Sequence, residues 1–236
     1  MKIKGFKIVY LALMLILFSI PMQGQIFKGM LIAGGNFSQI NGDQVYGYKR
    51  VGVNTGVGVM APLNNQRNFL ISMEVLYNQI GAKESQDPFK YNTKLSYASI
   101  PLIFHYEDRR GGLTFGLGFQ YSRLVQFNED WGLPDTIKYM DRPVLPVNDF
   151  SRDDFSFVVD VRFRVWKKIK FNFRYQRSMA PIRKEVMYTN SLPPVHSDFA
   201  SWKRNFYNDV LTFRVIYVIN ERSDSELDRR INRDQY

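Results

Sequence analysis

Hydrophobic and polar residues alternate through residues 154–178, DFSFVVDVRFRVWKKIKFNFRYQRS. The first set is bulky and apolar: Phe155, Phe157, Val159, Val161, Phe163, Val165, Ile169, Phe171, Phe173 and Tyr175. The second set is mostly polar or charged: Ser156, Val158, Asp160, Arg162, Arg164, Lys170, Asn172, Arg174 and Gln176. A period of two places the sets on opposite faces of a strand, and Lys167-Lys168 interrupts the run where a tight turn can form. The segment therefore predicts a β-hairpin with one apolar and one polar face.

The same alternation recurs along the chain and predicts eight strands, at residues 27–40, 50–61, 69–82, 94–106, 113–125, 154–166, 169–178 and 206–220. The connections alternate between polar loops at 41–49, 83–93, 126–153 and 179–205 and shorter turns at 62–68, 107–112 and 167–168. One short-turn rim and one long-loop rim are typical of outer-membrane barrels. We therefore expect an all-β fold: an eight-stranded antiparallel up-and-down transmembrane β-barrel with long extracellular loops and short periplasmic turns.

A soluble lipocalin-like barrel would also have eight antiparallel strands and one apolar face, so the interior has to discriminate between the two folds. In a lipocalin the phenylalanines would surround a ligand, whereas in a membrane barrel they face lipid. Glycines share the other face of strands 50–61 and 113–125, which suits a narrow, crowded interior. Aromatic residues also fall at both ends of the apolar band, as membrane interfaces favour. They are Tyr77, Tyr121 and Tyr175 on the loop side and Tyr106, Trp166 and Tyr217 on the turn side. These features favour the membrane barrel.

The N-terminus has the pattern of an export signal. Lys2, Lys4 and Lys7 precede an apolar run at 8–20, and the small residue Gly24 follows. The run is shorter than the about 20 residues of a membrane-spanning helix. We predict a signal peptide over 1–24, the barrel over 25–220 and a charged periplasmic tail over 221–236. Both termini of the mature chain would then be periplasmic, in the outer membrane of a Gram-negative bacterium.

Composition excludes several kinds of site. The chain has no cysteine, which excludes disulfides, thiolate metal ligands and a lipoprotein anchor. Loss of the three signal-peptide lysines takes the net charge from +10 to +7 (10 − 3). The basic residues are dispersed among strands and loops, so we predict no nucleic-acid partner and assign them to interior ion pairs and an anionic lipid surface.

Several runs in order carry a family resemblance: IAGGNFSQINGD, GVNTGVGVMAPL, EVLYNQIGAK, LSYASIPLIFHYE and GLTFGLGFQYS. Together they resemble the Bacteroidota outer-membrane β-barrel family often labelled PorT-like, over the mature chain to residue 220. The resemblance implies an eight-stranded outer-membrane barrel and, for the family's namesake, a part in type IX protein secretion. The chain departs from the family pattern in its charged tail, because it does not end on the aromatic residue of the last strand.

Charged residues on the polar faces would share one interior. They are Glu74, Asp160, Arg162, Arg164, Lys170, Arg174 and Arg214. Isolated buried charge is prohibitive, so these groups must pair or stay hydrated. We expect Glu74 to pair with one or more of Arg162, Arg164 and Arg174, and the group to form a structural network that holds the barrel closed. A selectivity filter is the alternative interpretation.

The sequence offers little catalytic chemistry. In strand 94–106 we expect Ala98 and the alternate residues to Tyr106 to face outward, and His105 to pack or hydrogen-bond inside. The run His196-Ser197-Asp198 has the residue types of a catalytic triad, but adjacent loop residues seldom converge in triad geometry. We predict no enzyme activity, no cofactor and no metal site.

Three classes of function are therefore open. The first is a structural or interaction barrel, accessory to protein secretion or envelope assembly, that meets the lipid bilayer with its strands. Its partners among envelope or secretion-machine proteins would bind loops 126–153 and 179–205 and tail 221–236. The second is a small-solute channel gated by the interior charges, and the third is an outer-membrane lipid-modifying enzyme.

Overall fold

The computed structural model describes residues 27–64, 66–84, 90–108, 112–132, 142–143, 149–166, 168–189 and 201–219. Ten strands lie in these ranges: β1 (Lys28–Asn41), β2 (Arg50–Pro62), β3 (Phe69–Glu84), β4 (Lys90–Asp108), β5 (Leu113–Gly132), β6 (Arg142–Pro143), β7 (Asp153–Trp166), β8 (Ile169–Ser178), β9 (Arg183–Thr189) and β10 (Ser201–Val218). No helix within the described ranges is long and apolar enough to cross a membrane.

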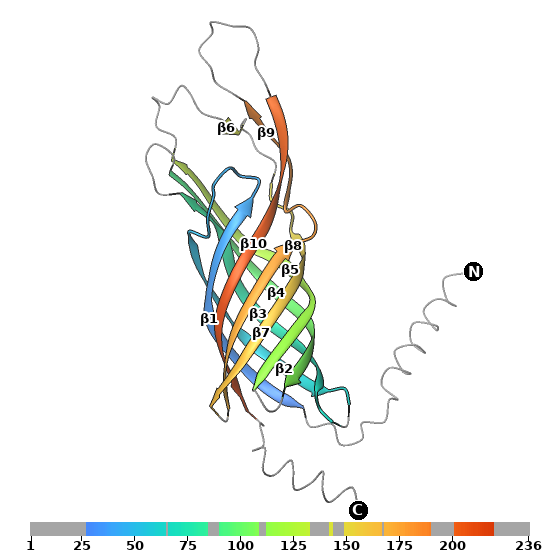
Figure 1. Ribbon diagram of the computed structural model, residues 1–236. Helices are drawn as coiled ribbons and strands as arrows, with labels where there is room; N and C mark the ends of the chain where they lie inside the picture. The colour runs from blue at the N-terminus through green and yellow to red at the C-terminus, as the bar shows by residue number, and fades with distance from the viewer. Residues whose placement is uncertain are drawn as a thin grey trace, which may run out of the picture.

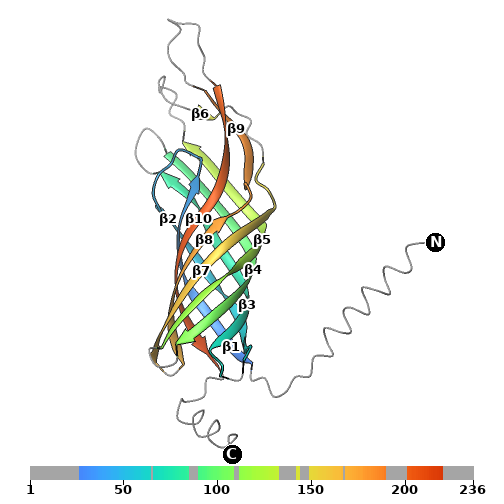
Figure 2. The ribbon, with the colours of Figure 1, turned by 45° about the vertical axis from the view of Figure 1, so that its right-hand side comes forward.

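Eight of these strands form a closed barrel of tilted strands (Figure 1). Each pairs antiparallel with the next in the order β1-β2-β3-β4-β5-β7-β8-β10, and pairing of β1 with β10 closes the ring. Strands β9 and β6 extend the sheet from β10 at the long-loop end, and a second view shows the same arrangement (Figure 2). The structure confirms the predicted eight-stranded antiparallel up-and-down barrel.

The two faces of the ring follow the predicted alternation. Phe155, Phe163 and Phe171 are about half exposed on the outside, whereas Asp160 and Arg162 are fully buried inside. Strand β4 also has the expected parity: Ala98, Ile100, Leu102, Phe104 and Tyr106 lie outside, and Ser99, Pro101 and His105 lie inside. A continuous apolar surface therefore surrounds a polar interior.

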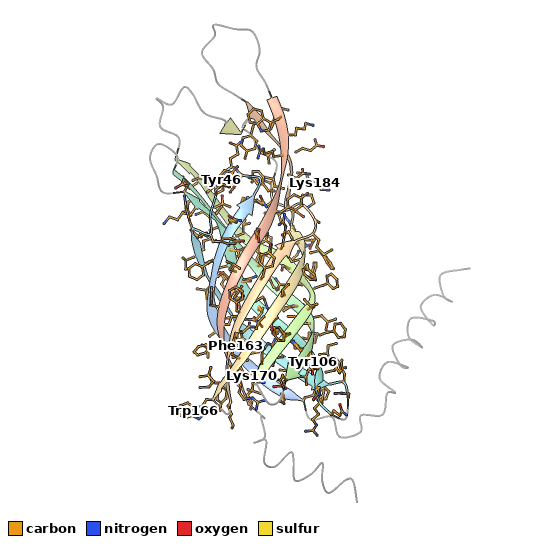
Figure 3. The ribbon with its side chains drawn as sticks, viewed as in Figure 1. Tyr46, Tyr106, Phe163, Trp166, Lys170 and Lys184 are labelled. Atoms are coloured by element: carbon orange, nitrogen blue, oxygen red, sulfur yellow. The ribbon has the colours of Figure 1, made fainter. Side chains whose placement is uncertain are left out.

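Aromatic side chains lie at the short-turn end of the apolar surface. Figure 3 shows Tyr106 and Trp166 at that end and Tyr46 and Lys184 at the opposite end. Tyr106 contacts Phe69 of the neighbouring strand, with ring centroids 5.4 Å apart. Exposed aromatic side chains at this level match the amphipathic anchors that membrane interfaces favour.

The barrel is longer at its loop end than the sequence predicts. Residues 126–132, expected in a loop, belong to β5, and the expected loop 83–93 includes the ends of β3 and β4. The expected loop 179–205 contains β9 and the first residues of β10. These predicted loop bounds were wrong because they rest on an apolar outer face, which only the lipid-facing part of each strand has. Beyond the membrane a strand pair can continue with polar residues outside and apolar residues inside.

That extension has an apolar core of its own, called the cap core here. Its buried members are Ile40, Ile80, Ala82, Tyr91, Leu95, Tyr97, Phe150, Ile182, Val186, Tyr188, Phe206 and Val210. The loop after β1 packs closely against β10 at Gly42. The φ of Gly42 is +107°, and a Cβ at this position would lie 2.3 Å from the carbonyl oxygen of Asn205 in β10. The long-loop end is therefore packed like a small soluble domain.

The predicted signal peptide 1–24 and tail 221–236 lie outside the described residues, as does His196-Ser197-Asp198.

Candidate functional site

Five charged side chains meet in the middle of the barrel and form the central charge network: Glu74, Asp160, Arg162, Arg174 and Arg214. They come from β3, β7, β8 and β10, and each is at most 2% exposed. Glu74 accepts hydrogen bonds from all three arginines, at 3.0 Å from Arg162, 3.0 Å from Arg174 and 2.9 Å from Arg214.

Asp160 is the second carboxylate of the network. Its oxygens accept hydrogen bonds from Nε of Arg162 at 2.7 Å and Nε of Arg174 at 2.8 Å. Nη2 of Arg214 lies 3.4 Å from Asp160 Oδ2. Three guanidinium groups and two carboxylates share the space, so the network carries one excess positive charge (3 − 2). Each carboxylate bridges several strands, and the network ties opposite walls of the barrel together.

Glycines make room for these groups. Gly58 pairs with Glu74, and a Cβ at Gly58 would lie 3.0 Å from Cγ of Glu74 and 2.9 Å from the terminal methyl of Met30. A Cβ at Gly116 would lie 2.4 Å from Nδ1 of His105. The glycines on the polar faces of β2 and β5 are therefore where the interior is most crowded, as the sequence suggested.

Two of the seven predicted interior residues belong to a separate group nearer the short turns. Lys170 donates a hydrogen bond to Glu107 at 2.9 Å, and Arg164 donates to the same oxygen at 3.1 Å. The structure thus does not bring Arg164 to Glu74. The sequence predicts a turn at 107–112, but Glu107 is the inward-facing penultimate residue of β4. Extending the strand alternation by two residues beyond His105 would have found it.

Apolar and neutral polar layers enclose the charges. An apolar cluster borders the network, mostly toward the short turns, although its member Leu76 lies two residues from Glu74 on the loop side of β3. Its members are Met30, Ile32, Met60, Leu70, Leu76, Ile216 and Val218. Toward the loops lie amides: Asn36 donates to Asn78 at 2.6 Å, and Gln120 donates to Gln176 at 2.9 Å. The cap core follows above them. Among the described residues, the interior is thus filled by side chains along its length, as expected for eight strands.

His105 forms the only arrangement here that approaches catalytic geometry in the described part of the chain. Its Nε2 lies 2.7 Å from Oγ of Ser72, and its Nδ1 lies 3.9 Å from Oδ1 of Asp160. The first distance is a hydrogen bond and the second is too long for one, so one of the two contacts of a triad is missing. Ser72 is 1% exposed and His105 is 2% exposed. The pair is a packed interior contact with no room for a substrate.

The cap core holds charged groups that sequence reasoning missed. Arg183 donates two hydrogen bonds to Glu129, at 2.8 and 2.9 Å, and its guanidinium lies 3.6 Å from the ring centre of Phe150. Asp43 is buried beside the same core, and its Oδ1 accepts a hydrogen bond from the backbone of Val45 at 2.9 Å. Burial raises the pKa of Asp43 to about 8, although backbone hydrogen bonds oppose the shift. The signal for these groups would have been apolar residues inside the supposed loops.

No group of three or more metal-binding side chains of the usual types occurs within the residues described. Of the seven charged residues predicted to share the interior, five form the central charge network. The other two, Arg164 and Lys170, bind Glu107.

Comparison with known proteins gives a family and a set of similar structures. Residues 10–197 match the model of the family described as outer membrane protein beta-barrel domain. No curated protein matches the sequence significantly. Among solved structures, the attachment invasion locus protein Ail of Yersinia pestis is 8% identical, with 81% of this chain and 98% of that chain covered and a TM-score of 0.43.

Two further solved structures are similar. Neisserial surface protein A is 11% identical, with 81% and 97% of the two chains covered and a TM-score of 0.44. Outer Membrane Protein W of E. coli is 10% identical, with 84% and 100% covered and a TM-score of 0.37. Because the family model covers most of the chain, the protein belongs to the outer membrane protein beta-barrel domain family, whose members lie in the outer membrane of Gram-negative bacteria.

Proposed function

We propose that this protein is a closed outer-membrane barrel with a structural or interaction role, accessory to protein secretion or envelope assembly. The observation that supports it is the filled interior. Glu74 and Asp160 hold three arginines across the barrel, apolar residues pack against this network, and the cap core lies beyond it toward the loops. A solute would have to break a buried ion-pair network to pass, and removal of one partner from such a network costs about 3–5 kcal/mol. The protein would therefore act through its outer surfaces, because its interior does not admit solutes.

The long-loop end is the surface proposed to meet partner proteins outside the cell. It carries a packed cap, and hydrophobic side chains are exposed on it away from the apolar band, among them Tyr46 at 79% and Met187 at 40%. The first and last strands are paired near the opposite rim, where Met30 lies beside Val218. Both termini would therefore be periplasmic. This arrangement fits an accessory of a secretion or assembly machine, as the resemblance to the PorT-like Bacteroidota barrels implies.

Conductance and cross-linking together test the proposal. The purified full chain in planar bilayers should give no steady ion current. In cells, a photo-reactive phenylalanine analogue at Tyr46 should cross-link to envelope proteins. The same analogue at Lys168, which is exposed in a short turn, should not give the same products. Steady wild-type current would favour the small-solute channel in place of the closed barrel. Identical products from the two ends would refute the proposed interaction surface.

A further inference from the structure

A one-residue irregularity in β5 turns polar side chains outward just beyond the apolar band. The register between β4 and β5 skips Val125, which is 68% exposed. The alternation of β5 therefore reverses there. Phe127 pairs with the buried Leu95 and contacts Phe150 of the cap core, with ring centroids 5.7 Å apart, although it stays 45% exposed. Gln126 and Asn128 occupy the outer face instead. Without the extra residue their amides would point into the barrel, so the bulge is what places them outside.

These two amides share a small pocket with two residues of β4. Gln126 pairs with Ser96 and Asn128 pairs with Lys94 in the sheet register. These four residues line a pocket of about 90 Å³. The lining offers one ammonium group, one hydroxyl and two amides, and none of the four residues carries a negative charge. A site with a cation, several N–H or O–H donors and no carboxylate suits an anion with several oxygen atoms.

The hydroxyl of Ser96 is oriented by a chain of hydrogen bonds. The amide of Gln79 donates to the hydroxyl of Tyr77 at 3.3 Å, and that hydroxyl donates to Oγ of Ser96 at 3.1 Å. A serine hydroxyl that accepts one hydrogen bond can still donate its own proton. Lys94 pairs with Gly81 of β3, and because glycine has no side chain it does not cover the amine of Lys94.

The pocket lies at the height of lipid headgroups. Tyr77 marks the loop-side end of the apolar face of β3, and Ser96 pairs with Gln79, two residues further out. A strand rises about 3.3 Å per residue, so the pocket begins about 7 Å along the strand from the end of the apolar band. The headgroup region of a bilayer leaflet occupies about the same depth.

We propose that this pocket binds the phosphate of a lipid headgroup in the outer leaflet. Lys94 supplies the opposite charge, as lysine does in many phosphate sites, and the hydroxyl of Ser96 and the two amides supply neutral donors. The outer leaflet follows from the proposed orientation of the long-loop end, whereas the pocket itself is independent of whether the interior conducts. Loss of binding and the appearance of conductance would therefore be separate results.

Native mass spectrometry of the full chain in detergent micelles tests the site with three probes: lipid A, lipid A from which the phosphates have been removed, and inorganic phosphate. Lys94→Gln should weaken lipid A binding by about tenfold or more, a loss of at least about 1.4 kcal/mol, because it removes a hydrogen bond between charged groups. Lys83→Gln is the matched control, since Lys83 is an exposed lysine at the same end and does not line the pocket. An unboiled gel should show both variants folded.

The expected result is phosphate-dependent and specific to Lys94: wild type prefers lipid A over its dephosphorylated form, and Lys94→Gln removes that preference. A Gln126→Ala variant should weaken the preference to a smaller extent. Equal losses for Lys83→Gln and Lys94→Gln would show unspecific attraction of charge and overturn the site. Equal binding of the two lipids by wild type would do the same. Inorganic phosphate bound as tightly as lipid A, with the same dependence on Lys94, would overturn the lipid as its source.

Discussion

Glu74→Ala is the sharpest test of the closed interior. Glu74 is fully buried and accepts hydrogen bonds of 2.9 to 3.0 Å from Arg162, Arg174 and Arg214, whereas the contact of Asp160 with Arg214 is longer, at 3.4 Å. Its removal leaves Asp160 alone against three guanidinium groups. The excess positive charge of the network rises from one to two (3 − 1) in a fully buried space where apolar side chains pack against the charges.

The expected cost follows from the three lost contacts. Each hydrogen bond to a charged group contributes about 1.5–3 kcal/mol, but the three share one carboxylate and do not add. Loss of one partner from a buried pair costs about 3–5 kcal/mol, and three dependent arginines place Glu74→Ala at the upper end of that range. For a chain of this size the unfolding temperature should fall on the order of 10 °C.

Thermal unfolding in detergent, followed by circular dichroism and by mobility on unboiled gels, measures this change, and planar bilayers measure leak. Two variants control the experiment. Glu74→Gln keeps an acceptor without the charge and should fall between wild type and alanine. Glu74→Ala with Arg162→Ala restores the wild-type excess of one positive charge and should recover part of the stability. If wild type conducts steadily and Glu74→Ala alters neither melting nor current, the reasoning about a closed network is wrong.

Three further predictions address other parts of the chain. Phe171→Arg places a charge on the lipid face, where Phe171 is 50% exposed, and should lower folding yield through a cost of about 2–4 kcal/mol, measured by the folded fraction on unboiled gels. Single cysteines at Tyr46 and Lys168 should react with an impermeant thiol reagent on whole cells at Tyr46 only, because the long-loop end is proposed to face outside. The third variant is Asp43→Asn. The wild-type cap should become less stable as the pH rises, and the variant should not show this loss. Burial raises the pKa of Asp43 from 3.8 to about 8. Between pH 3.8 and about pH 8 the unfolded chain has therefore lost a proton that the folded cap still holds. The stability of the wild-type cap falls as the pH rises through this range.

Each of these has a contrary outcome. Phe171→Leu, an apolar control, should fold as wild type, and equal failure of both variants would remove charge as the cause. Labelling at Lys168 alone would invert the orientation. For Asp43→Asn, hydrogen exchange of the cap at about pH 5 and about pH 8 is the measurement. An unchanged pH dependence in the variant would mean that another group titrates in the cap.

The sequence alone determined the fold and the two faces of the barrel. The reason is that a strand between lipid and a narrow interior has only two environments, so a period of two specifies the direction of every side chain. Phe171 and Arg174 could be assigned to opposite faces with no structure at all. The charges that share the interior followed from the same parity, together with the rule that buried charges pair.

Only the tertiary structure decided which interior groups meet. Arg162 and Arg164 have the same parity, yet Arg162 reaches Glu74 and Arg164 reaches Glu107. Height along the barrel depends on the stagger between strands, and alternation within one strand carries no information on it. The cap core was hidden for a related reason. Beyond the membrane the solvent outside is water, the inward residues become apolar, and bulges such as the one at Val125 reverse the parity. The local pattern there is that of a polar loop, and only pairing across strands that are distant in sequence turns it into a packed domain.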